Sequence, residues 1–323
     1  MSDREEKTGK NDNGKKNKGG KRNKIVAIEM IILVLLIMSA VAIFIQRDKS
    51  VKDAAKIHNQ KAKKTEQTPQ AAQKENEIEE ETEGTEEETG DRDASVPDRS
   101  NFAVQPGVSV GTTEQSDEKI VYLTLDDGPS DNTQAVLDIL DKYNAKATFF
   151  VTGEMPEYKD MIKAAYDKGH TIGMHTYSHD YAKVYASVDA YFQDLDQIGQ
   201  MVQEEIGYVP CFIRFPGGSS NTVSKKYTAG IMSTLVQEVQ NRGYQYYDWN
   251  GSSGDGSVRT TEELVAQATS FDSNNIILLC HDSHGKQTTV EALPQIIEHY
   301  QSLGYTFKAL DRDSFVAHHG VNN

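Results

Sequence analysis

After Ile120 the sequence alternates regularly between short strand-like runs and longer helical patterns. The strand-like runs are residues 120–125, 147–151, 170–174, 211–215, 244–249, 276–280 and 305–310. The helical patterns between them include residues 133–143, 188–206, 224–242, 261–271 and 290–303. Because parallel strands need a long crossover, usually a helix, this alternation predicts an α/β fold with a parallel sheet covered by helices. A small barrel of about seven parallel strands suits roughly 200 residues of this kind.

The sequence before this alternating part has a different composition. The whole chain is only 37% hydrophobic and has a formal net charge of −15, which indicates a disordered part beside a normal core. Residues 1–24 are polar and basic, residues 25–46 are almost entirely apolar, and residues 47–115 are polar with a run of acids. We therefore predict a basic tail, an apolar segment, a disordered acidic linker and one folded domain at residues 116–323.

Residues 25–46 are long enough and apolar enough to cross a bilayer as a helix. The basic tail before them predicts a cytoplasmic N-terminus, and therefore a single-pass protein of the cell membrane whose folded domain is extracellular. A cleavable signal peptide is the alternative, because residues 39–42 resemble a small-residue cleavage site. The apolar run continues past that point, which favours an uncleaved anchor. Nucleic acid is not an expected partner, since a basic tail beside a membrane span is better explained by topology or by anionic lipid.

The chain has two cysteines, Cys211 and Cys280. Two are too few for a disulfide framework, and their separation is not that of a metal site. Each lies in an apolar strand-like run, so we predict two buried free thiols.

Polar residues stand at the ends of most predicted strands. They are Asp126 and Asp127 after the first strand, His175 after the third, Arg214 in the fourth, Asp248 in the fifth and His281 after the sixth. The carboxyl ends of parallel strands form the edge at which α/β proteins build their sites. A tight turn explains the Asp-Gly-Pro sequence at 127–129, but not a second acid at the end of an apolar strand. We therefore predict one functional site at this edge of the sheet.

His175 and His179 stand four residues apart in "HTYSH". On one helical turn both imidazoles would face the same direction, as metal-binding His pairs do, although such pairs also occur by chance on surfaces. A carboxylate from the first strand would complete a set of two histidines and one aspartate, with positions left open for water and substrate. One acid of the pair Asp126 and Asp127 would bind the metal, and the other would be free to act as a base.

Five motifs resemble, in their order, those of the NodB-like polysaccharide deacetylases of carbohydrate esterase family 4. They are "TLDDGP" (124–129), "HTYSH" (175–179), "RFPGG" (214–218), "SSGDG" (252–256) and "LLCHD" (278–282). The resemblance covers about residues 117–315, and the first two motifs are its most specific part. It implies a distorted (β/α) barrel, in agreement with the strand pattern, and a hydrolase that removes N-acetyl groups from a polysaccharide. The chain as a whole looks like the membrane-anchored bacterial peptidoglycan N-acetylglucosamine deacetylases.

The resemblance also implies a role for individual residues and one divalent metal ion, most simply Zn²⁺, with Co²⁺ or Mn²⁺ as alternatives. The implied roles are metal binding for Asp127, His175 and His179, general base for Asp126, arginine partner of that base for Arg214, general acid for His281, and packing of the acetyl methyl for Leu279. These roles are chemically coherent, because such an ion activates water and polarises a carbonyl. An amine is a poor leaving group, which explains the need for an acid.

Two positions depart from the family pattern. Gly217 stands where many members have tyrosine, so an aromatic wall of the groove is expected to be missing, while a backbone N–H there can still stabilise an oxyanion. In the fourth motif an Asp-Trp ending is replaced by Asp255 and Gly256, which leaves open whether Asp255 or Asp248 orients the catalytic histidine. Trp249, the only tryptophan, is expected to line the substrate site, and the simplest role for Asp248 is a strand-end cap.

The leading hypothesis is a metal-dependent deacetylase of a cell-surface polysaccharide, with N-acetylglucosamine of peptidoglycan as the nearest substrate. N-acetylmuramic acid, chitin oligomers, poly-N-acetylglucosamine and acetylxylan are alternatives within the same enzyme class. A catalytically silent wall-binding module is a different class, and the complete set of acid, base and metal ligands argues against it. A metalloprotease is weaker still, because no Glu follows the first histidine of "HTYSH".

Overall fold

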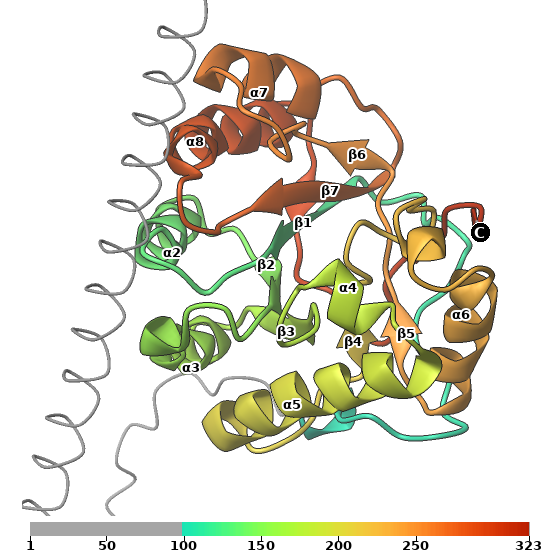
Figure 1. Ribbon diagram of the computed structural model, residues 1–323. Coiled ribbons are helices and arrows are strands. Elements are labelled where there is room, and N and C mark those ends of the chain that lie inside the picture. Colours follow the sequence, from blue (N-terminus) through green and yellow to red (C-terminus); the bar gives the residue numbers. More distant parts are fainter. Residues whose placement is uncertain (1–98, 323) are drawn as a thin grey trace, which may run out of the picture. The chain divides into compact units, whose positions relative to one another are not determined.

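The computed structural model describes residues 99–322, in which helices surround one curled parallel sheet (Figure 1). The strands are β1 (Ile120–Asp126), β2 (Ala147–Val151), β3 (Thr171–Met174), β4 (Phe212–Ile213), β5 (Gln245–Tyr246), β6 (Gly251–Ser252), β7 (Asn275–His281) and β8 (Thr306–Phe307). They follow the order β5-β4-β3-β2-β1-β7-β6, with β8 beside β1. All of these pairings are parallel. The sheet is a half-barrel with β5 and β6 at its two ends, which confirms the predicted distorted barrel.

The helices lie around the outside of this sheet (Figure 1). They are α2 (Thr133–Lys142), α3 (Asp160–Asp167), α4 (Tyr181–Val184), α5 (Val188–Ile206), α6 (Ile231–Asn241), α7 (Thr261–Ala268) and α8 (Gln287–Ser302), with 3₁₀ turns at Ser100–Phe102, Pro156–Tyr158 and Ser224–Lys226. Local sequence fixes several ends. The Ser187 side chain accepts a hydrogen bond from the N–H of Ala190 at the start of α5, and Gly207 ends that helix in the left-handed conformation.

The seven predicted strand ranges all contain a strand, although β4, β5 and β8 are only two residues long. The helix predicted at 224–242 is wrong as a single element. A 3₁₀ turn occupies Ser224–Lys226, and α6 begins only at Ile231, because Gly230 has a φ of 79° that no right-handed helix contains. The short strand β6 and the helices α3 and α4 lie outside the predicted ranges.

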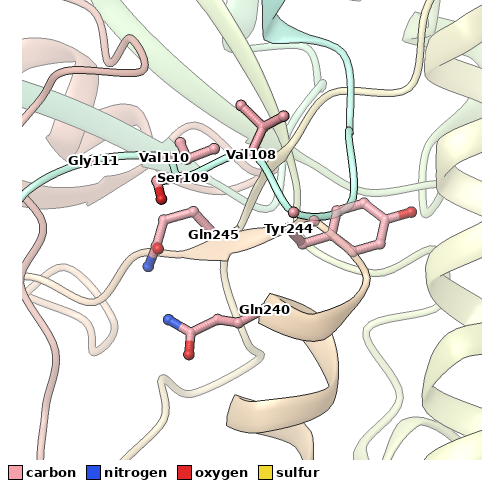
Figure 2. Close-up of a pocket in the computed structure, with 9 residues that line it drawn as sticks. Val108, Ser109, Val110, Gly111, Gln240, Tyr244 and Gln245 are labelled. Atoms are coloured by element: carbon pink, nitrogen blue, oxygen red, sulfur yellow. The ribbon is translucent and has the colours of Figure 1, made fainter.

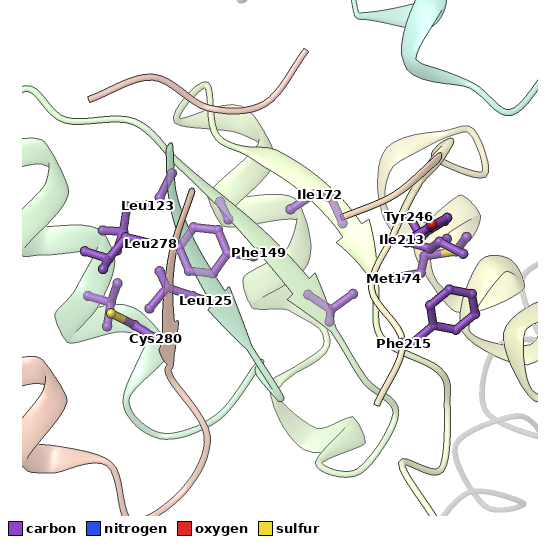
Figure 3. Close-up of a cluster of buried hydrophobic side chains, with 14 of the residues drawn as sticks. Leu123, Leu125, Phe149, Ile172, Met174, Ile213, Phe215, Tyr246, Leu278 and Cys280 are labelled. Carbon is purple, nitrogen blue, oxygen red and sulfur yellow. The ribbon is translucent and has the colours of Figure 1, made fainter. Parts of the chain in front are cut away.

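Alternation along the strands divides the core into two parts. In β1, Val121, Leu123 and Leu125 face the helices and belong to the larger hydrophobic cluster, part of which Figure 3 shows. Ile120 and Tyr122, which alternate with them, belong to a smaller cluster on the inner side of the half-barrel. Each fully buried leucine contributes about 1.5–3 kcal/mol. Because side chains alternate, the inward-facing row of β1 continues through position 124 to the acid at position 126.

The folded part begins earlier than predicted. Phe102 and Val110 are buried in the inner cluster, and the guanidinium of Arg99 donates hydrogen bonds to the carbonyls of Tyr166 and His170. The predicted boundary at residue 116 therefore lies too far along the chain, because apolar residues in a mostly polar stretch were assigned to the linker.

The predicted basic tail (1–24), membrane span (25–46) and the part of the linker before Arg99 lie outside the described residues. Within residues 99–322, no helix combines the length and the hydropathy needed to cross a bilayer. Cys211 and Cys280 are both buried and unpaired, as predicted. Burial raises the pKa of the Cys211 thiol to about 11.

Candidate active site

The first acid of the doubled pair, Asp126, ends β1 and lies between two strands. Its register partners are Phe150 in β2 and His281, the last residue of β7. The sheet pairing alone therefore brings an acid and a histidine from distant parts of the sequence side by side. The side chain of Asp126 is only 3% exposed, so its charge needs a partner inside the protein.

That partner is Arg214, which follows β4 and is completely buried. Its Nη1 donates to Oδ1 of Asp126 and to the hydroxyl of Thr124, each at 2.7 Å. Its Nε donates to the carbonyl of Tyr247 at 2.8 Å, and its Nη2 to the carbonyl of Asp248 at 3.1 Å. A buried ion pair is favourable only when its remaining donors are also bonded, and these contacts meet that condition. Arg214 therefore ties β1 to the segment after β5.

The second acid, Asp127, turns out of the strand with a φ of 67°. An aspartate can adopt this left-handed conformation at a modest cost. The turn aims Oδ1 at the Nε2 atoms of His175 and His179, 3.5 Å and 3.3 Å away. Burial by itself would raise the pKa of Asp127, but the neighbouring imidazoles outweigh that effect and the pKa is lowered. Oδ1 of Asp126 is bonded to Arg214 and Oδ1 of Asp127 faces the two histidines, while Oδ2 of Asp126 also lies 3.7 Å from Nε2 of His175.

His175 and His179 do converge, but not on the predicted helical turn. They lie in the loop between β3 and α4, where Thr176 and His179 have φ values of 68° and 47°. A carboxylate from α5 holds this loop. Asp194 accepts hydrogen bonds from the backbone N–H groups of Tyr177 and Ser178 and from the Ser178 hydroxyl. A tertiary contact of this kind can stabilise left-handed residues that local preferences disfavour.

The three side chains fit a metal ion. The ligand atoms of Asp127, His175 and His179 all lie within 4.8 Å of one another, and within residues 99–322 no other group of three such residues does this. The Nδ1 atom of His175 lies 2.8 Å from the carbonyl of Arg214. Since a carbonyl can only accept, Nδ1 carries the proton and Nε2 keeps its lone pair for a ligand. Burial lowers the pKa of His175, which favours the neutral form that metals bind.

A buried oxygen without a hydrogen-bond partner supports the same metal position. Oδ1 of Asp127 is buried and has no hydrogen-bond partner among the described residues. A buried carboxylate oxygen without a donor is costly. A cation between Asp127 and the two histidines would satisfy it. The chemistry of the donor set, two imidazole nitrogens and one carboxylate oxygen, suits Zn²⁺ and similar divalent ions.

His281 is held by Asp255, and not by Asp248. Its Nδ1 lies 2.7 Å from Oδ1 of Asp255, and its backbone N–H donates to Oδ2 of the same carboxylate at 2.8 Å. The hydroxyl of Thr289 donates a further hydrogen bond to Oδ2 at 2.8 Å. Burial would lower the pKa of His281, but the bond to Asp255 outweighs it and raises the pKa to about 9. The free Nε2 lies 4.0 Å from Oδ2 of Asp127, so a protonated imidazole faces the candidate metal position.

Asp248 has other partners, in agreement with a capping role. Its carboxylate accepts hydrogen bonds from the backbone N–H and the hydroxyl of Ser219, and from the backbone N–H of His319. Trp249, next to it, is half-buried and lies against Gly218. Asp248 therefore lies beside the predicted site, and none of these hydrogen bonds connects it to His281.

A side chain from another element lies against Gly217. Gly217 has a φ of 75°, and a β-carbon built on it would come within 2.6 Å of the hydroxyl of Tyr181. Tyr181 begins α4, and its ring packs edge-on against the ring of His179 at 5.7 Å. Only glycine leaves room for this tyrosine. Leu279, two residues before His281 on β7, shares its face of the strand and is 8% exposed.

The sequence patterns missed three residues of this site: Tyr181, Asp194 and Asp282. Asp282 is completely buried behind the turn after Asp127, and the Thr133 hydroxyl donates to its Oδ2 at 2.6 Å. Burial raises its pKa to about 7. For Asp194 a signal existed in the sequence, since it is an acid on the buried face of α5. Asp282 is the last residue of the "LLCHD" motif, although that motif did not indicate its burial, and Tyr181 had no signal in the local pattern.

A cavity of about 380 Å³ lies elsewhere, at the start of β5 and the end of α6 (Figure 2). Its lining includes residues 107–111 together with Gln240 and Gln245. None of the predicted site residues lines it. It opens at the amino end of a parallel strand, whereas sites in this kind of fold form at the carboxyl ends.

Comparison with known proteins agrees with the geometry. The family model described as "Polysaccharide deacetylase" matches residues 113–236. The crystal structure of the catalytic domain of a peptidoglycan N-acetylglucosamine deacetylase from Eubacterium rectale is 47% identical, with a TM-score of 0.63, over 65% of this chain and 97% of that one. A polysaccharide deacetylase structure from Bacillus cereus is 30% identical, with a TM-score of 0.53, over 64% of this chain and 97% of that one.

A curated relative extends the same likeness. The peptidoglycan-N-acetylglucosamine deacetylase of Bacillus cereus is 29% identical over 226 residues, which are 65% of this chain and 78% of the relative. The residues that the family model matches, 113–236, contain the acids of β1, the histidine loop after β3 and Arg214, so this likeness includes part of the site as well as the fold. The chain belongs to the polysaccharide deacetylase family, the NodB-like group of carbohydrate esterase family 4.

Proposed function

We propose that this protein is a metal-dependent hydrolase that removes N-acetyl groups from a cell-surface polysaccharide, with N-acetylglucosamine residues of peptidoglycan as its substrate. The observation that carries the proposal is the meeting of three charged or ligating groups at one edge of the sheet. These are the Asp126–Arg214 pair, the Asp255–His281 pair and the Asp127, His175 and His179 cluster. A base, an acid and a metal position within reach of one another are what hydrolysis of an unactivated amide requires.

Asp127, His175 and His179 would hold the ion. A divalent cation there, Zn²⁺ first and Co²⁺ or Mn²⁺ as alternatives, would polarise the acetyl carbonyl and lower the pKa of a water molecule. Asp126 is the proposed base and accepts the proton of the attacking water. Arg214 fixes the position of that carboxylate, because one of its own nitrogens donates to Oδ1 and leaves Oδ2 to face the site.

His281 is the proposed acid. Its pKa of about 9 keeps the imidazole protonated at neutral pH, so Nε2 can donate a proton to the amine as the C–N bond breaks. Asp255 accepts a hydrogen bond from Nδ1–H of the imidazole and holds the ring in place. The base and the acid thus lie on adjacent strands, with their end residues in register.

The remaining proposed roles concern the substrate. The backbone N–H of Gly217 would stabilise the developing oxyanion, and Leu279 would pack against the acetyl methyl. Trp249 and Tyr181 would form aromatic walls for a sugar ring. Peptidoglycan is preferred to chitin oligomers, poly-N-acetylglucosamine, N-acetylmuramic acid or acetylxylan because two of the similar proteins are named for N-acetylglucosamine of peptidoglycan.

The location proposed for this activity is the outer side of the cell membrane. Residues 25–46 would anchor the chain, with the basic residues before them on the cytoplasmic side. The acidic linker would then separate the folded domain from the bilayer and let it reach the wall. This placement is supported by sequence alone.

The test is acetate release by the full-length protein from purified peptidoglycan and, separately, from N-acetyl-chitooligomers. We expect release from peptidoglycan that chelators abolish and Zn²⁺ restores. His175→Ala should abolish it, whereas His284→Ala, at an exposed histidine bonded only to Asp131, should not. Acetate release from chitooligomers and not from peptidoglycan would show that the substrate proposed here is wrong. No release from any acetylated glycan would favour a silent binding module.

A further inference from the structure

The last residues of the described chain lie against the candidate site. After β8 the chain returns to the segment that follows β5, where the N–H of Asp248 donates to the carbonyl of Ala317 at 3.0 Å. The next two residues are both histidines, and they contact different elements. His318 stacks on the ring of Tyr246 in β5 with a centroid distance of 4.0 Å, while the backbone N–H of His319 donates to Oδ2 of Asp248 at 2.8 Å. We call residues 317–322 the C-terminal strap.

The side chain of His319 joins two loops of the site. Its Nε2 lies 2.6 Å from the carbonyl of Trp249, and its Nδ1 lies 3.1 Å from the hydroxyl of Ser220. A carbonyl only accepts, so Nε2 carries the proton, and Nδ1 accepts from the serine hydroxyl. The imidazole also packs edge-on against the Trp249 ring at 4.8 Å. Asn322 adds a second contact to the same loop by donating to the carbonyl of Ser220 at 3.1 Å.

Asp248 extends these contacts to the reacting groups. Its side chain is completely buried and accepts the N–H and the hydroxyl of Ser219 at 2.8 Å and 2.5 Å. Its backbone carbonyl accepts from Arg214, the partner of Asp126. One residue therefore connects the C-terminal strap, the loop at residues 216–220 and the arginine of the base.

The loop needs such a restraint, because it contains two consecutive glycines. Gly217 and Gly218 both have positive φ values, 75° and 76°. Glycine loses more conformational freedom than any other residue when it is fixed, so this backbone has little intrinsic preference for the conformation that aims the Gly217 N–H. The bonds to Ser219 and Ser220, immediately after the glycines, supply the fixation from outside the loop.

We propose that Asp248 and His319 are positioning residues of this enzyme, and that the C-terminal strap holds the loop carrying the oxyanion-binding N–H at Gly217. The inference rests on the proposed deacetylase function and adds to it residues that lie beyond the five motifs. A misplacement of about 1 Å can cost on the order of a hundredfold in rate. Loosening one anchor of the loop should therefore reduce turnover without removing the metal or the substrate walls.

The experiment compares two neighbouring histidines in the full-length protein. His319→Ala removes the side-chain bond to Ser220 in the loop and the bond to the carbonyl of Trp249. His318→Ala removes a stacking contact and polar contacts with β5 and leaves both of those bonds in place. We expect kcat for acetate release to fall roughly tenfold in His319→Ala, with the affinity measured by Zn²⁺ titration unchanged. His318→Ala should keep the wild-type kcat even if its Tm falls as much. His319→Gln can still donate to the carbonyl of Trp249, so it should recover part of the loss.

A second measurement does not depend on activity. Trp249 is the only tryptophan of the chain, so intrinsic fluorescence reports on the strap directly. Acrylamide quenching should increase in His319→Ala and not in His318→Ala. Equal kcat values for His319→Ala and the wild type would overturn the positioning role. Unchanged quenching would overturn the contact itself. An inactive wild type with the quenching difference present would instead count against the proposed function and leave the strap in place.

Discussion

Replacing Asp255 by asparagine should move the pH dependence of turnover. Asparagine has nearly the same shape but no charge, and Asp255 is only 2% exposed, so its charge acts on His281 with little screening. The wild-type contact consists of the Nδ1 bond at 2.7 Å and the backbone bond at 2.8 Å. The asparagine oxygen can keep one of these bonds, which preserves the position of the ring while removing the negative charge that favours its protonation.

The size of the effect follows from the pKa of His281. That pKa is about 9, compared with an ordinary value of 6.5, and each pH unit corresponds to about 1.4 kcal/mol. The environment therefore stabilises the protonated imidazole by about 3 kcal/mol, against a burial effect of opposite sign. Without the charge of Asp255 the largest of the effects that raise this pKa is lost, so the pKa falls. A cation bound at Asp127 repels the imidazolium in both proteins, so the difference between them is the quantity to compare.

The assay is kcat for acetate release between pH 5.5 and 10. An acid catalyst must be protonated, so wild-type turnover should decline as the pH rises through the pKa of His281, which the bond to Asp255 raises. In Asp255→Asn the decline should begin at a lower pH. Thr289→Val, which removes one hydrogen bond to the carboxylate and keeps its charge, should shift the decline less. An aryl acetate, whose leaving group scarcely needs a proton, should show a much smaller change. An unshifted decline in Asp255→Asn with the polysaccharide would refute the acid role.

The adjacent acids should separate two functions. Asp126→Asn should keep its affinity for Zn²⁺, measured by titration, and lose at least a hundredfold in kcat for acetate release. Asp127→Ala should lose the affinity for Zn²⁺ itself. Loss of Zn²⁺ affinity in both variants would contradict the assignment of one acid as base and the other as metal ligand. Tyr181→Ala should raise KM about fivefold, because an aromatic contact contributes about 1 kcal/mol, and exposed Tyr227→Ala should not. Protease added to intact, wall-stripped cells should cut within residues 47–98 and release an active domain. If the domain is cut free only after the membrane is permeabilised, the predicted orientation is wrong.

Strand positions and strand ends were predictable because they depend on local patterns. Apolar runs of five or six residues predicted β1, β2 and β7, and parallel pairing then places their last residues at one edge without further information. Asp126 and His281 are an example, since they are neighbours in register although the sequence separates them by most of the domain. The site could be located from the sequence for this reason.

Loop geometry was not predictable in the same way. A spacing of four residues predicts a helical turn for His175 and His179, and the chain instead uses left-handed residues that Asp194 stabilises from α5. The helical preference of a sequence does not show that a tertiary contact will impose a different backbone conformation. The packing of Tyr181 against Gly217 was unpredictable for the same reason. The space beside this glycine is filled by a side chain from α4, which is a tertiary contact.

The charges of the site explain why these particular pairs belong together. Asp126 is matched by Arg214, and Asp255 by the imidazolium of His281, so each pair has no net charge. Asp127 keeps a negative charge, and the two histidines are neutral when they act as ligands. A divalent cation therefore leaves one net positive charge in a largely buried site. Amide hydrolysis passes through a negatively charged transition state, and a fixed positive charge at that position stabilises it without reorganisation. A further acid facing the site would cancel this charge. Asp282, a further carboxyl that lies against Gly128, avoids that effect in part because burial raises its pKa to about 7.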